Sequence, residues 1–356
     1  MAKTIEKKIE LHNYFWMRRK IERPLVSFRI ASDFFFATHF KAANDLLVEG
    51  KKITPSMLNV DSFLNDYERI YQDISSIGQD GFWVAEPFFG IPWMEAMLGC
   101  EIYATKSSFV SKPWVKSLEE TKKIEFNAEN EWFKKYMEFI EKLIILSRGR
   151  FPISQQIMRG PSDMVGALLG QLELVYYLVD KPEEMKILFS RVADIFLNVI
   201  KHGYNIIPKF YGGYSIGYFH IWVPEKCILF QEDLSAILSP TYYRLFLKKP
   251  DIKICKRYKY NAIHLHPSSF FILNDLLQID NLKLIEINKD IGGPTISEML
   301  PQFKRVLESK RLVIWGALDL TDLELIKKEL PAKGLFLNIV IPSIEKAREI
   351  LEFIEV

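Results

Sequence analysis

Short apolar runs recur along the whole chain and alternate with longer amphipathic stretches. Most of these runs are apolar at consecutive positions, which is typical of parallel strands buried on both faces. We predict eight strands, over residues 24–28, 81–85, 152–157, 227–230, 261–265, 283–287, 312–315 and 335–340.

The stretches between the runs repeat their apolar residues with the helical period. Pro182, Glu183 and Glu184 are typical of a first helical turn, and Ser239 followed by Pro240 predicts an N-cap and the first position of a helix. We predict helices over residues 65–77, 129–148, 182–202, from 239 onward, 267–277, 296–309, 322–330 and 343–353.

Strands that alternate with helices over 356 residues predict an α/β fold, a (β/α)8 TIM barrel. We expect a single domain over residues 1–356, in which residues 1–23 form an N-terminal helical extension. The first three βα loops carry long insertions, at 29–80, 86–151 and 159–226. Insertions of this kind usually form a lid or a wall of the substrate site.

Net charge, cysteine content and the lengths of apolar runs indicate which partners and which compartment to expect. A net charge of +2 with no long basic block argues against a nucleic-acid partner. Three cysteines without close pairs suit a reducing compartment, and no apolar run is long enough to span a bilayer. The charged N-terminus lacks the apolar segment of a signal peptide. We therefore expect a cytoplasmic protein that acts on a small-molecule substrate without binding a membrane.

The most informative motif is His264-Leu265-His266, at the end of a predicted strand. Residues i and i+2 of a strand face the same side, so both imidazoles are expected to project together at the barrel mouth. Two imidazoles and one carboxylate make an open site for zinc or another divalent metal. The alternative is that one histidine packs in the barrel wall while the other caps the next helix.

Several carboxylates compete for the third metal position, with Glu232 preferred and Asp233, Glu86 and Asp290 as the other candidates. Glu232 and Asp233 also follow a predicted strand, where they are candidates for general acid or base catalysis beside His264 and His266. Their alternative role is to supply negative charge to the start of the next helix.

Other residues that follow predicted strands are candidates for substrate binding: Arg29, Glu86, Arg159, Gln231 and Asp290. The segment 160–163 opens a helix, so its backbone N–H groups and Asp163 are a candidate anion site, or a simple helix cap. The glycines after Asp290 allow a close approach to a ligand or merely connect a strand to a helix.

The insertion at 204–222 is rich in tyrosine, tryptophan and glycine, and we expect Tyr211, Tyr214 and Trp222 to line a ligand wall. The aromatic stretch 33–36 adds to this expectation; the alternative is a lid that packs its own aromatic residues. Gly213 to Gly217 match G-x-S-x-G, but no strand and helix flank Ser215, so turn chemistry explains the motif better than a nucleophile does.

The order and spacing of several segments resemble the uroporphyrinogen decarboxylase superfamily. These segments are Gly160-Pro161, residues 180–183, 231–240, 263–266 and 290–294, with looser matches at 23–25 and 86–99. The resemblance implies a (β/α)8 barrel. It also implies one of two activities, decarboxylation of a tetrapyrrole or methyl transfer between corrinoid proteins and thiols.

The chain departs from both branches. Tetrapyrrole decarboxylases carry several arginines after the first strand, where this chain has Arg29 alone, and Glu86 takes the place of an aspartate. The methyltransferases bind zinc through H-x-C and a later cysteine. Here His264 matches their first ligand, His266 replaces the cysteine, and no cysteine lies near Val340.

The sequence therefore favours a methyltransferase-like enzyme with a metal or polarising site at the barrel mouth. The resemblance implies a corrinoid protein as a partner, and a homodimer as in many of the decarboxylases. The first alternative is a metal-free decarboxylase or lyase that acts on a small carboxylate or a tetrapyrrole-like substrate, with Arg29 and Arg159 as anchors. The second is a ligand-binding barrel without catalysis.

Overall fold

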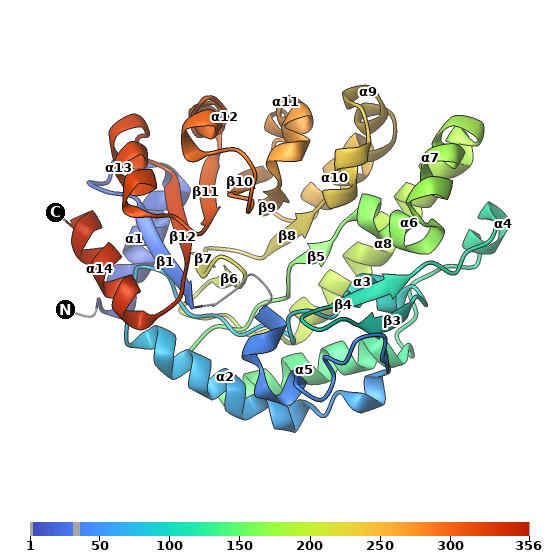
Figure 1. Ribbon diagram of the computed structural model, residues 1–356, viewed down its shortest axis with the longest axis horizontal. Coiled ribbons are helices and arrows are strands. Elements are labelled where there is room, and N and C mark those ends of the chain that lie inside the picture. The colour runs from blue at the N-terminus through green and yellow to red at the C-terminus, as the bar shows by residue number, and fades with distance from the viewer. Residues whose placement is uncertain (1–2, 31–35, 356) are drawn as a thin grey trace.

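The computed structural model describes residues 3–30 and 36–355, and most of the aromatic stretch 33–36 lies outside this part of the chain. Within it, seven parallel strands form one curved sheet surrounded by helices (Figure 1). Their spatial order is β1 (Leu25–Ile30), β12 (Leu335–Ile341), β11 (Arg311–Gly316), β10 (Leu282–Asn288), β9 (Tyr260–Leu265), β8 (Cys227–Gln231) and β5 (Met158–Arg159).

The predicted second strand closes the circle between β1 and β5 without forming a regular ladder. Ala85 makes a single parallel bridge to Ile153, and the N–H groups of Asp80 and Gly81 both donate to Val26 O. Some hydrogen-bonding groups of β1 that a neighbouring strand would pair are bound by side chains instead. Phe28 N, for example, donates to the Gln79 side chain at 2.6 Å. The fold is thus a TIM-barrel-like α/β fold, but the expectation of regular strands over 81–85 and 152–157 is wrong.

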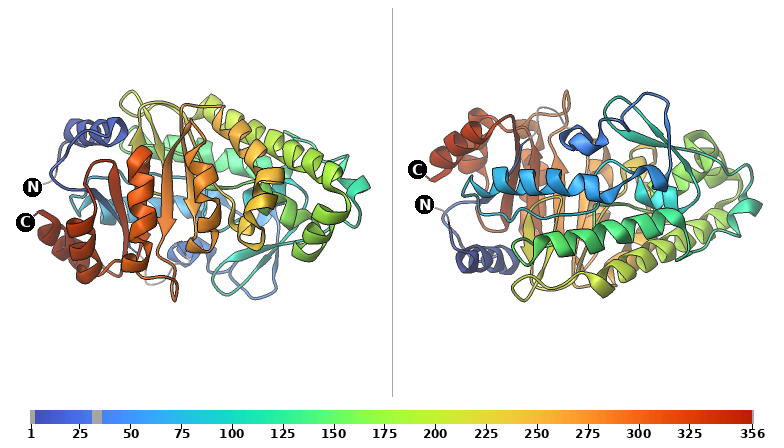
Figure 2. Two further views of the ribbon diagram at one scale, coloured as in Figure 1. Left: turned by 90° about the horizontal axis from the view of Figure 1, so that it is seen from above. Right: turned by 90° about the horizontal axis from the view of Figure 1, so that it is seen from below.

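The helices match the periodicity of the sequence closely. Figures 1 and 2 show them around the outside of the sheet, with both ends of the chain at the same end of the molecule. The main ones are α2 (Val60–Ser75), α5 (Glu131–Ser147), α6 (Pro161–Leu169), α7 (Gln171–Asp180), α8 (Pro182–Ile206), α10 (Lys248–Cys255), α11 (Leu273–Leu277), α12 (Ile296–Ser309), α13 (Leu320–Glu329) and α14 (Ile344–Glu355).

The insertions add smaller elements. These are α3 (Trp93–Met97), α4 (Leu118–Thr121), the small antiparallel sheet of β2 (Lys52–Ile53), β3 (Glu101–Ala104) and β4 (Phe109–Lys112), and the hairpin of β6 (Tyr214–Ile216) and β7 (Ile221–Val223). Outside the insertions, the short helix α9 (Pro240–Tyr242) follows β8. A π-helical turn over Tyr243–Leu247 joins α9 to α10.

The hairpin β6–β7 belongs to the core of the barrel. It follows α8, and a segment after a helix enters the barrel at the N-terminal ends of the strands. Ile216, Phe219 and Val223 are fully or almost fully buried in one cluster with Leu229 and Phe336 from the strands. The insertion therefore supplies side chains that fill the barrel from within.

Helix α1 (Ile5–Met17) covers the same end of the barrel. Thr4 caps the helix, and Phe15 and Trp16 are buried on its inner face. Trp16 Nε1 donates to Trp222 O at 2.7 Å, and the Trp16 ring meets the Tyr260 ring edge-on at the start of β9. With this end closed, polar side chains at the opposite, C-terminal ends of the strands are left to form a site. No described helix is long and apolar enough to cross a membrane.

Candidate functional site

The two histidines of the motif meet at the C-terminal end of β9. His264 is buried and His266 is partly exposed, and their Nε2 atoms lie 3.0 Å apart. The rings are nearly perpendicular, with centroids 4.6 Å apart. The expectation that the i and i+2 imidazoles project together is met, and His266 is close enough to His264 to share a ligand or a proton with it.

Each histidine uses its other ring nitrogen to bind a carboxylate from β10 or the loop that follows. Glu286 lies opposite His264 in the strand register and contacts His264 Nδ1 closely. Asp290 Oδ1 lies 2.7 Å from His266 Nδ1, and Asn288 Nδ2 donates to the same carboxylate. These contacts fix the orientation of both rings.

The carboxylates also control protonation. Burial alone lowers the pKa of His264, but the charge and hydrogen bond of Glu286, together with Asp233 and Asp290, outweigh burial and raise that pKa to about 9. An ionised carboxylate only accepts hydrogen bonds, so both Nδ1 atoms carry protons. The raised pKa of His264 means that its Nε2 also carries a proton at neutral pH, unless a metal ion takes the place of that proton. Two Nε2 lone pairs 3.0 Å apart would repel each other unless a cation lies between them. That cation is either a metal ion or a shared proton.

Asp233 completes a group of three side chains that could hold a metal ion. Its ligand atom and those of His264 and His266 all lie within 4.8 Å of one another, and its Oδ1 is 4.0 Å from His266 Nε2. Gln231 Nε2 donates to the second carboxylate oxygen at 2.5 Å. Two imidazoles, a carboxylate and an open side fit a catalytic zinc or a similar divalent ion.

Glu232, the residue for which we expected the role of third ligand, points away from the histidines. Side chains alternate along a strand, and Gln231 and Asp233 face the barrel interior, so Glu232 faces the helices. It is buried, and its Oε2 accepts a hydrogen bond from Ser162 N at 2.7 Å. The predicted anion site at the start of α6 is thus filled by the protein's own carboxylate.

Asp163 also has an internal partner. Its carboxylate accepts hydrogen bonds from Leu234 N at 2.8 Å and Asp233 N at 3.3 Å. It therefore shapes the turn that presents Asp233, which differs from the substrate contact that we expected of Asp163.

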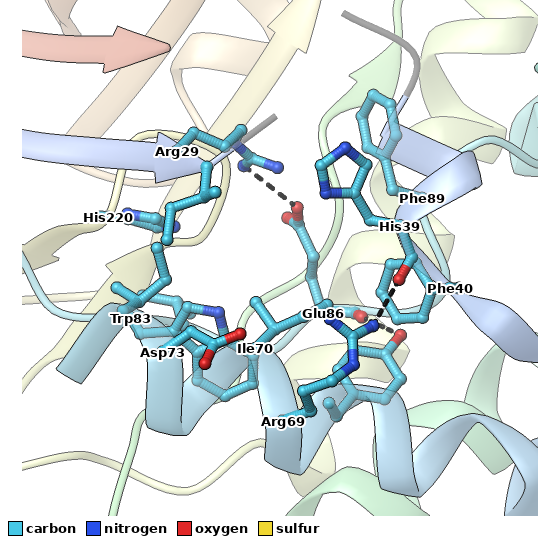
Figure 3. A pocket seen from close by; sticks show the side chains of 14 residues that line it. Arg29, His39, Phe40, Arg69, Ile70, Asp73, Trp83, Glu86, Phe89 and His220 are labelled. Carbon is cyan, nitrogen blue, oxygen red and sulfur yellow. Dashed lines mark hydrogen bonds and ion pairs between the residues drawn. The ribbon is translucent and has the colours of Figure 1, made fainter. Parts of the chain in front are cut away.

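Arg29 and Glu86 lie together near Tyr218, whose ring is also close to His264. Arg29 Nη2 donates to Tyr218 O at 2.9 Å, its guanidinium lies 4.7 Å from the centre of the Tyr218 ring, and it is 3.9 Å from Glu86 Oε1. The Tyr218 ring is in turn 6.4 Å from that of His264. Figure 3 shows Arg29 and Glu86 facing each other in a pocket of about 100 Å³, with His39 and Phe89 beside them.

Burial raises the pKa of Glu86 to about 7, although Arg29 opposes this shift. The carboxyl group is therefore poised to give or take a proton near neutral pH. Arg29 and Glu86 were both predicted as site residues because each follows a predicted strand.

The aromatic insertion behaves differently from its prediction. Tyr214 and Trp222 are buried at the other end of the barrel, where Tyr214 packs on Tyr204 and Trp222 Nε1 donates to Phe210 O. Tyr211 is half exposed beside them. The structure thus leaves these three apart from the histidines. Only the tip of the hairpin reaches the site, through Tyr218.

Ser215 lies in β6 and is buried, and a hairpin surrounds it in place of the strand and helix of a nucleophile elbow. The hydroxyl has no hydrogen-bond partner among the described residues. The structure agrees with turn chemistry as the source of the motif.

Two further residues were missed from the sequence, Glu286 and Glu95, while Tyr218 was expected only as part of the aromatic insertion 204–222. Glu286 had a signal, because a charged residue within a buried apolar strand needs a partner. Glu95, in α3, is completely buried and contacts Arg159 Nε at 3.2 Å through Oε1. Neither Glu95 nor Tyr218 had a pattern that linked it to the strands.

No family model and no curated protein matches this chain. Its fold is similar to the solved structure of a methyltransferase from Methanosarcina mazei, with a TM-score of 0.63 over 97% of each chain and 13% sequence identity. At this identity the likeness shows the fold, which is also the fold that the superfamily resemblance implies. The chain thus has a TIM-barrel-like fold similar to that of this structure, with a candidate site of its own residues at the C-terminal ends of β8, β9 and β10.

Proposed function

We propose that the protein is a metal-dependent enzyme with methyltransferase-like activity, in which His264, His266 and Asp233 hold a divalent metal ion. One observation carries the proposal: the two Nε2 atoms lie 3.0 Å apart while each Nδ1 is held by a carboxylate. A buried or half-buried carboxylate behind each metal-ligating histidine is the usual outer shell of a zinc site.

A bound zinc ion would supply Lewis acidity that lowers the pKa of a coordinated thiol or water at neutral pH. Glu286 and Asp290 retain the protons at Nδ1 of His264 and His266, so that both Nε2 atoms stay free as ligands. Asp233 adds one negative charge, whereas two cysteine thiolates would add two. This donor set is harder than that of the thiol methyltransferases, and it favours zinc, cobalt or manganese over cuprous copper.

The pair of Arg29 and Glu86 near Tyr218 supports proton transfer. Glu86 is buried with a pKa of about 7, and Arg29 orients it from 3.9 Å. Glu86 would accept the proton that a substrate nucleophile releases, and Arg29 would hold a negatively charged part of the substrate. The corrinoid protein and the homodimer remain parts of the proposal. Gel filtration tests both, with the protein alone and with a methylcobamide-loaded corrinoid protein.

The second candidate is a metal-free lyase in which the cation between the histidines is a proton. The raised pKa of His264 favours it, since an imidazolium shared with His266 would serve as a general acid toward a small carboxylate. Arg29 and Arg159 would be the anchors of that substrate.

Metal analysis separates the two candidates. We expect purified protein to contain close to one equivalent of a divalent metal, and chelated protein to bind zinc again in isothermal titration calorimetry. His264→Ala, His266→Ala and Asp233→Asn should each weaken zinc binding by about tenfold or more. Glu232→Gln, at the neighbouring position that points away, is the matched control and should keep the wild-type affinity.

Metal-free protein that binds no zinc would refute the metal site. Equal losses in Asp233→Asn and Glu232→Gln would refute the assignment of the third ligand. Turnover of a carboxylate substrate that resists chelation and is lost in His264→Ala would establish the lyase instead.

A further inference from the structure

A second pocket lies at the C-terminal ends of β5 and β8, where residues of α3 form part of its lining. It has a volume of about 110 Å³. Its polar lining consists of Arg159, Gln231, Glu95, Gln156 and Ser108. The aromatic residues Phe89 and Trp93 form part of the apolar lining. Such a mixture of an apolar wall with a few converging polar groups is typical of a small-molecule site.

The strand register connects this pocket to the histidines. Arg159 pairs with Gln231, and Gln231 pairs with His264, so the three residues form one row across β5, β8 and β9. Ile157, two residues before Arg159, packs in the interior cluster of the barrel, so Arg159 faces the same way. Two strand spacings place the Arg159 and His264 backbones about 10 Å apart. Gln231, between them, donates to Asp233 and lines the pocket.

Glu95 holds Arg159 by one nitrogen of its guanidinium, and the two Nη atoms have no hydrogen-bond acceptor among the described residues. Glu95 Oε1 lies 3.2 Å from Arg159 Nε, and the charge of Glu95 is the main cause of the raised pKa of Arg159. Glu95 is fully buried, and neither of its oxygens accepts a hydrogen bond from any described residue. No described residue accepts a hydrogen bond from the two Nη atoms of Arg159, and 47% of its side chain is exposed. The fork of Nη groups is free to bind an oxyanion with two parallel hydrogen bonds.

We infer that this pocket binds a single oxyanionic group, such as a carboxylate, on a substrate whose reacting atom lies at the histidines. The inference rests on the proposed function for the reacting end, but its anion site stands on Arg159 and Glu95 alone. Arg159 supplies one positive charge, and the nearby carboxyl groups of Glu95, Asp163 and Asp233 already interact with it, so a singly charged group fits better than a polycarboxylate. The spacing of about 10 Å between backbones leaves room for a short chain of a few atoms between the two groups.

Two pairs of probes test the two ends of the inference separately. Propionate and 1-propanol differ in charge and need no metal. 3-Mercaptopropionate and 1-propanethiol differ in the same way and also carry a thiol for the metal. Binding is measured by calorimetry and by ligand-observed NMR, on metal-free and zinc-loaded protein.

We expect wild-type protein to bind each carboxylate about tenfold or more tightly than its uncharged partner, as charge-assisted hydrogen bonds predict. Arg159→Met should abolish this preference and leave zinc affinity unchanged, while Arg159→Lys should retain part of it. Arg348→Met, on the exposed face of α14, is the matched control and should behave as wild type.

Equal binding of charged and uncharged probes by wild type would overturn the inference. So would a preference that survives in Arg159→Met. Protein that binds no zinc yet prefers propionate through Arg159 would refute the proposed function and leave the anion site standing. A circular dichroism spectrum and melting temperature for each variant separate loss of binding from loss of folding.

Discussion

Replacing Glu86 by glutamine is expected to stabilise the protein at alkaline pH far more than in acid. Glu86 is buried, its Oε2 accepts no hydrogen bond from a described residue, and Arg29 is 3.9 Å from its other oxygen. The ionised carboxylate therefore lacks most of the solvation that it has in the unfolded chain, and one distant guanidinium offsets only part of this loss.

The pKa of Glu86 gives the size and the sign of the change in the free energy of unfolding. Burial raises this pKa from 4.5 to about 7, and the folded protein therefore holds this proton more tightly than the unfolded chain. The contribution of Glu86 to the free energy of unfolding falls as pH rises from about 4.5 to about 7, and stays lost above. At about 1.4 kcal/mol per pH unit, the full loss is about 3 kcal/mol. Glutamine, which does not ionise, avoids it.

Urea denaturation at about pH 5 and about pH 8.5 measures the effect. We expect Glu86→Gln to gain about 3 kcal/mol relative to wild type at the higher pH and about 1 kcal/mol at the lower pH. Glu352→Gln, on the exposed surface of α14, should change little at either pH. A difference between Glu86→Gln and wild type that does not change with pH would refute the raised pKa.

Three further predictions concern other parts of the molecule. Glu286→Gln should weaken zinc binding about tenfold to a hundredfold in competition with a chromophoric chelator, since a weaker acceptor then holds His264 Nδ1; an unchanged affinity would contradict its role behind the ligand. Phe219→Ala should cost about 3–5 kcal/mol in urea denaturation, because this fully buried ring fills the barrel interior; a loss below about 1 kcal/mol would show that the hairpin is dispensable for packing. Ser215 should form no adduct with phenylmethylsulfonyl fluoride by intact mass, because it is buried in β6 without a base; a stoichiometric adduct would revive the nucleophile.

The pattern of apolar residues was sufficient to predict the barrel and most of its helices. Parallel strands buried on both faces and capped helices leave clear local signals, as in α12, whose bounds match the prediction. The second strand was not predictable in the same way. Gly81 N donates to Val26 O and Phe82 N donates to the hairpin carbonyl of His220. The Gln79 side chain accepts the hydrogen bond from Phe28 N that a regular ladder would use, and none of these contacts leaves a periodic signal in the sequence.

The aromatic insertion was misplaced although the sequence held the information to place it. A helix from residue 182 onward was predicted, and a segment that follows a helix returns to the N-terminal ends of the strands. The insertion was nevertheless assigned to the opposite, substrate-binding end because of its composition. The observed role of Phe219 and Ile221 in the interior cluster shows that topology should have outweighed composition.

The choice between Glu232 and Asp233 shows a limit of a different kind. In a strand that is apolar on both faces, alternation says that adjacent residues point to opposite sides, but it does not say which side is the barrel interior. Only the register with His264 settles that Gln231, and with it Asp233, faces inward.

The adjacent residues Glu232 and Asp233 have different roles in the site. Glu232 accepts a hydrogen bond from Ser162 N at the start of α6, while Asp163 from the same helix accepts hydrogen bonds from Asp233 N and Leu234 N. A carboxylate from each of the two segments, the end of β8 and the start of α6, thus accepts hydrogen bonds from backbone N–H groups of the other segment. These hydrogen bonds hold the backbone of Asp233 in place without using its side chain. The Asp233 carboxylate, held by Gln231 alone among these residues, therefore stays available to the histidines.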